Sequence, residues 1–461
     1  MTRLIVGPFN RVEGDLEVTL DVADGVVREA RVGALLYRGF EAMMRGRPAT
    51  DALVVAPRIC GICSVSQSTA AARALAAAAR VVPPPNGRLA ADLVLACETV
   101  ADHLTHFVLF FMPDFARACY AGRPWHQAAR RRFAATEGEA AQRLLPARAR
   151  FLHLMGILAG KWPHSLALQP GGTTKAVDPA ERVRLLAILA EFRAELESVV
   201  FADRLEAVAA LDSVDALAAW ADAAPATQGD FRLFLHIARD LGLEGLGKGT
   251  GTYLSSGGFF APGVLDGQGV AAFDPAQVAE DSTSTWPPTV AEKPDAYSWS
   301  KAPRLAGRVV EVGALARQAV DGHPLARRLA ETGGGVLARV VARLLEVARL
   351  LPLMEVWVRA LKPGEPFCID APIAADSASV GLAEAARGTL GHWLTLSGGH
   401  VASYSIIAPT TWNFSPRDAG GVPGALEQAL VGTPVLPGDG ASVAVQHVVR
   451  SFDPCMVCTV H

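Results

Sequence analysis

The sequence predicts a mostly helical α+β protein, with a bundle of long helices as its core and small antiparallel sheets beside it. Three observations lead to this prediction. Several alanine- and leucine-rich segments have apolar residues at helical spacing. The first 36 residues or so alternate as strands do around Asp24-Gly25, a dipeptide typical of hairpin turns. Residues 245–306 are rich in Gly, Pro, Ser and Thr, and this segment should wrap around a larger body, so we expect one domain over 1–461.

The individual elements follow from local signals. Strands are predicted over residues 3–35. A helical stretch from about 49 ends near Pro57, and the alanine-rich helix after Cys63 stops at Pro83-Pro84-Pro85. Longer helices are expected at about 88–111, 138–159, 178–200, 230–241 and 308–361. From 381 to 416 we expect the start of a helix, a hairpin around 393–407 and a proline-bounded loop, and a last helix should cover 441–452.

The composition excludes several classes of protein. Hydrophobic residues make up 51% and charged residues 19% of the chain, which excludes intrinsic disorder. A net charge of -3 provides no basic excess, so we expect no nucleic-acid partner. The most apolar windows carry Asp, Glu or Arg every few residues, and we expect buried helices there and no membrane span. The first residues have no apolar export segment, so we expect no export signal in the chain itself.

Four of the seven cysteines form two C-x-x-C pairs near opposite ends of the chain, Cys60 with Cys63 and Cys455 with Cys458. An odd and sparse set of cysteines argues against a disulfide framework. A C-x-x-C turn directs two thiolates at one point, so two such turns supply four sulfurs for a tetrahedral metal or a cluster. His461 follows Cys458 by three residues and can point back to the same region.

A structural zinc site with four cysteine ligands is the simplest alternative. The two pairs are almost 400 residues apart and lie among apolar residues, however, whereas zinc knuckles usually form on polar local loops. A buried site with four thiolates needs positive metal charge and nearby hydrogen-bond donors. Arg58 and Arg387 are the candidate donors.

With several other blocks, the two pairs resemble the large subunit of nickel–iron hydrogenases. The blocks occur in the family's order and span the chain: Arg11-Val12-Glu13-Gly14, Tyr37-Arg38-Gly39-Phe40-Glu41, Arg58-Ile59-Cys60-Gly61-Ile62-Cys63, Glu384-Ala385-Ala386-Arg387-Gly388 with Gly391-His392-Trp393, Pro409-Thr410-Thr411-Trp412-Asn413, and Asp453-Pro454-Cys455-Met456-Val457-Cys458-Thr459-Val460-His461. The resemblance implies that fold, and it implies that all four cysteines ligate nickel. Cys63 and Cys458 should also bridge to an iron that carries carbon monoxide and cyanide, while Cys60 and Cys455 should be terminal on nickel.

The resemblance also implies roles for the residues around the metals. Arg387 should lie over them and donate to one cyanide, and Thr410 should donate to the second. Asp114 and Asp453 match acids that form hydrogen bonds near this arginine. The family usually has a proline directly before the arginine, where this chain has Ala386.

The reaction implied is heterolytic cleavage of dihydrogen. Cys455 should take the proton and pass it to Glu13, because a carboxylate beside a buried metal site has its pKa raised toward neutrality. A second metal position, usually magnesium, is matched by Glu41, the backbone carbonyl of Ile406 and His461.

The electrons need a route out of the chain. Cys97, Cys119 and Cys368 are isolated in the sequence, and small buried apolar roles are the simplest interpretation for them. We therefore expect a separate small subunit that carries iron–sulfur clusters.

Three details resemble the regulatory, hydrogen-sensing members of the family. Gln67 stands where most members have a histidine, the chain stops at His461 without the usual removable extension, and Ile62 and Phe110 are bulkier than the residues usual near the gas route. A narrower route implies slow turnover and oxygen tolerance. A sensor histidine kinase would then be a partner, and the assembly would be cytoplasmic. The alternative is an energy-conserving uptake hydrogenase, and a metal-free or zinc-only structural relative is a weaker one.

One further pattern has a simpler interpretation. Glu98, Asp102 and His106 fall at i, i+4 and i+8 on one face of a predicted helix. A carboxylate metal site would need matching ligands from other helices, and the sequence offers no second set. We therefore expect a polar network or a subunit contact here.

Overall fold

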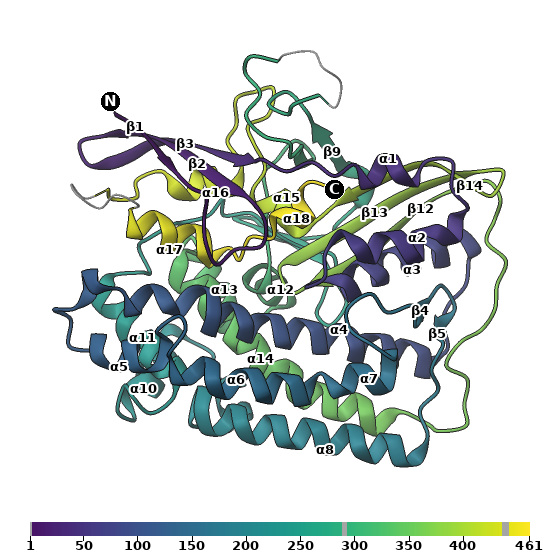
Figure 1. Ribbon diagram of the computed structural model, residues 1–461, viewed down its shortest axis with the longest axis horizontal. Helices are drawn as coiled ribbons and strands as arrows, with labels where there is room; N and C mark the ends of the chain where they lie inside the picture. The colour runs from purple at the N-terminus through teal and green to yellow at the C-terminus, as the bar shows by residue number, and fades with distance from the viewer. Residues whose placement is uncertain (1, 288–292, 436–441) are drawn as a thin grey trace.

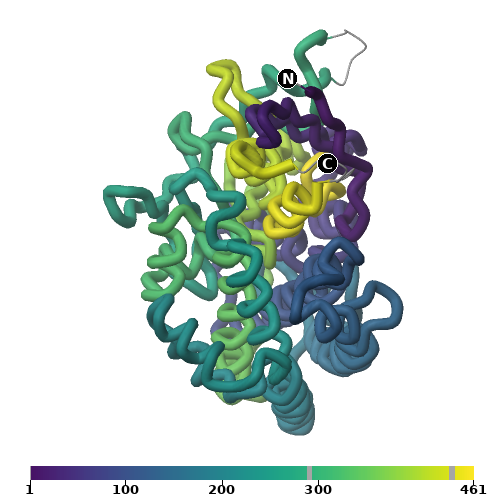
Figure 2. The backbone as a smooth tube through the Cα atoms, turned by 90° about the vertical axis from the view of Figure 1, so that its left-hand side faces the viewer, coloured from purple at the N-terminus to yellow at the C-terminus, as the bar shows by residue number. Residues whose placement is uncertain are grey.

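The computed structural model describes residues 2–287, 293–435 and 442–461. In Figure 1 the long helices α4 (Pro85–Thr105), α6 (Glu139–Phe151), α8 (Pro179–Glu195) and α14 (Val336–Ala360) stack across the lower half, and the main sheets lie above them. The view from the side in Figure 2 agrees, and in both views the N-terminal and C-terminal segments meet at the same end of the molecule. The protein therefore has the predicted architecture, a helical core with small sheets beside it.

The N-terminal sheet confirms the predicted hairpin. It contains β1 (Thr2–Val6), β2 (Leu16–Ala23) and β3 (Val26–Ala34), all antiparallel, in the order β1-β2-β3. Leu16, Val18 and Leu20 are fully buried on one face of β2, as expected for a strand with one side in the core. Asp24 and Gly25 have φ of 56° and 71°, the left-handed turn geometry that the dipeptide predicts.

The helical core also follows the prediction, except that the stretch predicted over 308–361 begins with extended residues and then divides into three helices. Its long members are α3 (Ser64–Ala79), α4 (Pro85–Thr105), α6 (Glu139–Phe151), α7 (His153–Ala159), α8 (Pro179–Glu195), α11 (Asp230–Leu241) and α14 (Val336–Ala360). The shorter helices are α1 (Phe40–Met44), α2 (Ala52–Val55), α5 (His126–Phe133), α9 (Leu205–Ala209), α10 (Val214–Asp222), α12 (Ala314–Asp321), α13 (Pro324–Glu331), α15 (Pro409–Asn413), α16 (Ala425–Leu430), α17 (Val443–Ser451) and α18 (Met456–Thr459). The predicted last helix is α17, and residue 441 lies outside the described residues.

Helix α4 continues as a π-helical turn over His106–Phe111 and a 3-10 turn over Met112–Ala116. The whole stretch Pro85–Ala116 is long and apolar enough to cross a membrane by length and composition, which we had not expected of any segment. Within the protein, 83% of its most apolar window is buried. It is therefore the central helix of the core, as its interspersed charged residues predict.

A second three-stranded sheet corrects one prediction. Residues 377–385, where we expected a helix to start, form strand β12 (Ser377–Ala385), which pairs with β13 (Gly388–Ser397), and β13 pairs with β14 (His400–Ile407). The strand packs on α3 so closely that a Cβ at Gly381 would lie 2.0 Å from the carbonyl oxygen of Ala70. Tertiary packing of this kind overrides the helix propensity of the alanines.

The glycine- and proline-rich segment contains short strands, as expected. They are β6 (Tyr253–Ser255), β7 (Gly263–Asp266), β8 (Gly269–Ala271), β9 (Val278–Asp281) and β10 (Ala302–Leu305). Strand β11 (Glu311–Val312) joins β6 in parallel, and β4 (Leu168–Gln169) pairs with β5 (Gly172–Thr173). Part of the predicted irregular segment, 288–292, lies outside the described residues.

Candidate metal centre

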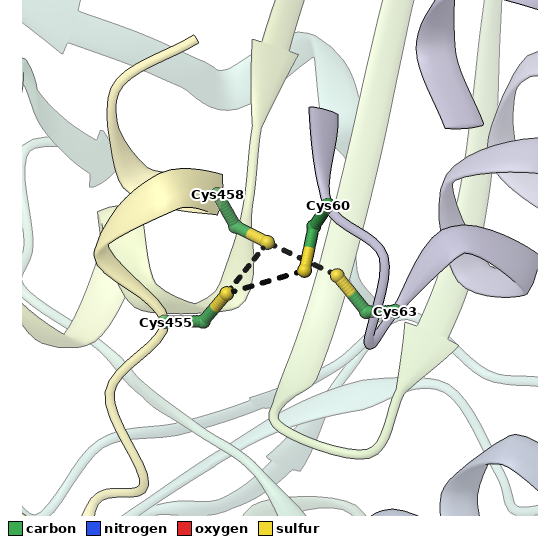
Figure 3. Close-up of side chains that lie close together, drawn as sticks. All are labelled: Cys60, Cys63, Cys455 and Cys458. Atoms are coloured by element: carbon green, nitrogen blue, oxygen red, sulfur yellow. Dashed lines mark hydrogen bonds between the residues drawn. The ribbon is translucent and has the colours of Figure 1, made fainter. Parts of the chain in front are cut away.

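The fold brings the four predicted cysteine thiols together. Cys60 ends the 3-10 turn Ala56–Ile59, Cys63 lies at the start of α3, and the C-terminal pair lies at the start of α18 and within it. The sulfur atoms are 3.6 Å apart between Cys60 and Cys455, 3.0 Å between Cys63 and Cys458, and 2.9 Å between Cys455 and Cys458 (Figure 3). All four lie within 4.8 Å of one another and are buried.

Backbone contacts hold the two cysteine loops side by side. The guanidinium of Arg38 donates to the carbonyl oxygens of Ile59, at 2.5 Å, and of Val457, and thus joins both loops. The amide of Met456 donates to the carbonyl oxygen of Glu13 at 2.7 Å. Arg38 lies within one of the family-like blocks, but the sequence alone indicates no role for it, because its two partners are far apart along the chain.

The electrostatics of the pocket favour a bound cation. Burial raises the pKa of Cys455 and of Cys458, while hydrogen bonds to the other thiols and burial raise that of Cys63. Only the pKa of Cys60 is lowered, by hydrogen bonds from the other three thiols. Four buried thiolates therefore require external positive charge, and a soft divalent metal supplies it. The donor set thus fits a nickel-containing centre.

Arg387 lies in the turn between β12 and β13 and is fully buried. Its Nε and Nη2 donate to the carbonyl oxygen and to Oδ1 of Asp453, at 2.9 and 3.1 Å. Its Nη1 lies 3.1 Å from Oδ2 of Asp102, but forms no hydrogen bond of good geometry with any described residue. Burial acts to lower the pKa of Arg387, but the carboxylates of Asp102 and Asp453 raise it by more. The arginine is therefore a permanent cation with one N–H group still available to a ligand.

The acid partner of this arginine is a correction. We expected Asp114 and Asp453, but Asp114 lies beyond the end of α4, 2.6 Å from Arg450, and also pairs with Arg11. Asp102, three helical turns earlier on α4, takes the place beside Arg387. The periodicity that aligns Glu98, Asp102 and His106 was the signal for it. The predicted polar network is also present, because Glu98 accepts hydrogen bonds from Val65 and Ser66 at the start of α3.

Glu13 and Thr410 lie beside the second cysteine pair. Glu13 forms a parallel bridge with Cys455, and burial, with the nearby Cys60, raises the pKa of its carboxyl. The hydroxyl oxygen of Thr410 accepts the amide of Cys455 at 3.1 Å, which leaves its O–H group to donate elsewhere. Both residues thus lie next to the backbone of Cys455.

The predicted second metal position forms a separate pocket of about 320 Å³ at the C-terminus. His461 Nε2 lies 3.5 Å from Oε1 of Glu41, which also accepts the amide of Ile406 at 2.8 Å. The ammonium of Lys301 lies 3.0 Å from Glu41 and 3.1 Å from Glu280. Against the effect of burial, His461, Lys301 and the Ile406 amide lower the pKa of Glu41 to about 2. An anionic carboxylate beside an imidazole fits a hard divalent cation.

Three further predicted residues are Arg58, Ile62 and Phe110, and their surroundings differ. Arg58 is a correction: it is exposed, and its guanidinium donates to the carbonyl of Val54, one turn back, so it contributes nothing to the pocket. Ile62 is partly buried against the cluster that contains the cysteines. Phe110 is partly buried in the π-helical turn, where its carbonyl accepts from Arg11.

The fold and this four-thiol site define a nickel-dependent hydrogenase. The chain belongs to that family, because the family description "Nickel-dependent hydrogenase" matches residues 38–124 and 142–461. It is the catalytic large subunit of a [NiFe] or [NiFeSe] hydrogenase, an oxidoreductase.

Individual hydrogenase large subunits match this chain over nearly all of their length. The chain is 27% identical to the periplasmic [NiFeSe] hydrogenase large subunit of Desulfomicrobium baculatum, over 100% of this chain and 95% of the relative. It is 24% identical to the hydrogenase-2 large chain of Escherichia coli, over 100% and 97%. The structure of the Ni-Fe-Se hydrogenase from D. vulgaris Hildenborough superposes with a TM-score of 0.85 at 26% identity, and each chain is covered completely.

Proposed function

We propose that the thiolates of Cys60, Cys63, Cys455 and Cys458 would hold nickel, and that Cys63 and Cys458 would also hold an iron that carries carbon monoxide and cyanide. This group, when bound, supplies the heterolytic cleavage of dihydrogen. Arg387 and Thr410 hold its small ligands through the N–H and O–H groups that they have available. Cys455 holds the released proton on its sulfur, and Glu13, whose raised pKa suits proton transfer, carries it away.

Magnesium is the second metal of this proposal. Glu41, His461 and the backbone at Ile406 would hold it, and the neighbouring Glu280 and Lys301 would bind its water ligands. The ion would fix the C-terminal segment, and with it Cys458, against the core. Metal analysis after dialysis against a chelator tests this: loss of magnesium should loosen the C-terminus without releasing nickel at once.

The finer proposal is a regulatory, hydrogen-sensing hydrogenase of low turnover. The observation that carries it is the setting of Gln67, one helical turn after Cys63. Gln67 Oε1 lies 2.8 Å from Nε2 of His392, and Nδ1 of His392 lies 2.8 Å from the hydroxyl of Tyr404. Burial lowers the pKa of His392 to about 3, so the ring is neutral and donates to the glutamine. This position therefore provides a neutral amide one helical turn after Cys63, where a histidine would bring a titrating group.

Electron transfer requires a partner. Within residues 2–287, 293–435 and 442–461, the four site cysteines are the one group of three or more clustered ligands found, and Cys97 is buried by itself. We propose that a small subunit with iron–sulfur clusters takes the electrons, consistent with the words "large subunit" and "large chain" in the names of the relatives. For the sensor, we further propose a histidine kinase as partner and a cytoplasmic location.

The alternative is an uptake hydrogenase, and the names of relatives favour it: the chain is 24% identical to the uptake hydrogenase large subunit of Rubrivivax gelatinosus over its full length. The first experiment is an infrared spectrum of the purified complex. One carbonyl and two cyanide bands that respond to dihydrogen would support the centre, whereas zinc without nickel would contradict it.

Turnover then separates the two functions. Slow dihydrogen oxidation, with kinase autophosphorylation that depends on dihydrogen, is expected for the sensor. Rapid turnover without any effect on a kinase would favour uptake, and cell fractionation with an antibody would test the location.

A further inference from the structure

The turn that carries Arg387 is not favoured by its own sequence. Ala385 pairs with Gly388, so Ala386 and Arg387 form a two-residue hairpin connection. Connections of this length favour positive φ at one or both central residues, and therefore glycine or asparagine. Neither Ala386 nor Arg387 has a positive φ. The conformation of this turn must therefore be imposed by contacts from elsewhere in the protein.

One set of contacts is steric. Gly388 has a φ of 127°, and a Cβ there would lie 2.6 Å from the amide nitrogen of Gly313 and 2.7 Å from Val312. The turn is thus pressed against the segment that leads into α12. Three residues into that helix is Arg317, whose side chain is only 1% exposed.

Arg317 binds the backbone of the turn directly. Its Nη1 donates to the carbonyl oxygen of Ala385 at 2.8 Å, and its Nη2 donates to that of Ala386 at 2.9 Å. These are the last two carbonyl groups before Arg387. A guanidinium presents its donors in a fixed plane, so it can hold two neighbouring carbonyls in a defined relation, which an ammonium cannot do.

Two buried carboxylates hold the guanidinium in turn. Its Nε lies 3.0 and 2.9 Å from the two carboxylate oxygens of Glu346, on α14, and Nη1 lies 3.1 Å from Glu384. Glu384 also accepts from the hydroxyl of Thr389 at 2.6 Å and from the amide of Ser256 at 2.8 Å. Arg317 therefore links α12, α14 and the β12–β13 hairpin in one buried network.

We propose that Arg317 is a positioning residue for Arg387. Arg317 fixes the backbone of the turn, while Asp453 and Asp102 fix the guanidinium of Arg387 at its other end. Together they fix the position of the Arg387 guanidinium, whose Nη1 forms no hydrogen bond of good geometry with a described residue. The proposal rests on the nickel–iron centre proposed above, and it adds a residue that has no contact with the thiols themselves.

The test uses Arg317→Lys in the complete complex. Lysine keeps the positive charge beside Glu346 but cannot bind both carbonyls, so the turn should shift. Misplacement by about 1 Å can cost ~100-fold in rate, and we expect kcat to fall roughly 10- to 100-fold. The KM for dihydrogen should change little, because Arg317 does not touch the gas. The cyanide bands of the loaded centre should move, since the hydrogen bond from Arg387 to its ligand changes.

Arg304→Lys is the matched control. Arg304 is equally buried, binds Asp418 at 2.7 Å and donates to backbone carbonyls, yet it lies away from the turn. Its variant should lose thermal stability to a similar degree and keep the wild-type cyanide bands and kcat per nickel. If Arg317→Lys behaves in the same way as this control, the positioning role is wrong.

Glu346→Gln is the second test variant, and it is used if Arg317→Lys binds no nickel. In this variant Arg317 keeps Glu384 as its counter-charge, so the protein should still fold. We expect the cyanide bands to shift in the same way as in Arg317→Lys, but by less. Unchanged bands in this variant would overturn the inference. Missing carbonyl and cyanide bands in the wild-type complex, with nickel present, would instead contradict the proposed centre, so the two failures are distinguishable.

Discussion

Oδ2 of Asp102 lies 3.1 Å from Nη1 of Arg387, and both side chains are buried beside the four thiols. A helix α4 residue thus meets the β12–β13 turn from across the core. The contact gives the arginine a carboxylate partner that the sequence placed only on a polar face of a helix, without indicating Arg387 as its partner. It also means that charge at Asp102 helps to fix the position of Nη1 of Arg387.

Asp102→Asn should therefore impair catalysis with little loss of structure. The amide keeps the size of the side chain but removes its charge, while Asp453 continues to hold Arg387. We expect activity to fall about 10- to 100-fold, with nickel content unchanged. Asp114→Asn is the contrasting variant: it removes one partner of a buried ion pair with Arg450 and should cost roughly 3–5 kcal/mol of stability. Activity per nickel and urea unfolding measure the two effects, and equal losses of stability in both variants would contradict this assignment.

Replacing any one site cysteine by serine should abolish nickel binding. A serine hydroxyl is a hard, protonated ligand and does not replace a bridging or terminal thiolate. We expect less than a tenth of the wild-type nickel in Cys455→Ser or Cys63→Ser by mass spectrometry of the metals, as a rough threshold for a lost ligand. Cys97→Ser is the control for loss of a buried thiol, and Cys368→Ser for an exposed one. Normal nickel in a site variant would remove that cysteine from the ligand set.

Glu13→Gln should separate metal binding from proton transfer. The amide preserves the backbone bridge to Cys455 but cannot take up and release a proton near neutral pH. General acid–base groups contribute about 10²–10⁴-fold, so we expect hydrogen–deuterium exchange activity to fall within that range while nickel and infrared bands persist. Glu17→Gln, on β2, is the control and should remain fully active. Retained exchange in Glu13→Gln would mean that another group carries the proton.

The sequence was sufficient for the fold class and for the four cysteines, because C-x-x-C turns fix the direction of two sulfurs locally. It was insufficient wherever a contact depends on three-dimensional packing. Arg38 acts through the carbonyls of Ile59 and Val457, and nothing in its neighbours indicates them. Lys301 comes from the irregular segment, which has no periodicity to interpret.

The two largest errors have the same physical origin. The second half of strand β12 is buried at Gly381 and at 383–385, which face both sides of the sheet, so its alanines and glycine show no alternation and look helical. Arg58 was chosen because it is two residues from Cys60, but the 3-10 turn points its side chain outward. In both cases the local sequence was a poor guide to the packing in three dimensions.

The Arg317 network also predicts a pH dependence of stability. Burial acts to raise the pKa of Glu346, but Arg317 and His103 outweigh it and lower this pKa from 4.5 to about 2. The folded state therefore favours the carboxylate, and its contribution, on the order of 3 kcal/mol, is present above pH 4.5 and lost as the pH falls toward 2. Urea unfolding from pH 6 down to 2 should show a weaker pH dependence for Glu346→Gln than for wild type. Glu331→Gln, an exposed glutamate, should retain the wild-type dependence.

The final prediction concerns oxygen. If Ile62 and Phe110 narrow the gas route, then Ile62→Val with Phe110→Leu should let dioxygen reach the centre. We expect this double variant to oxidise dihydrogen normally without oxygen and to be inhibited when oxygen is added, while the wild type continues. Ile373→Val is a matched control, because Ile373 and Ile62 are both partly buried against the same apolar cluster. Amperometric dihydrogen uptake in gas mixtures measures the difference. Equal oxygen inhibition of wild type and double variant would show that these two side chains do not restrict access.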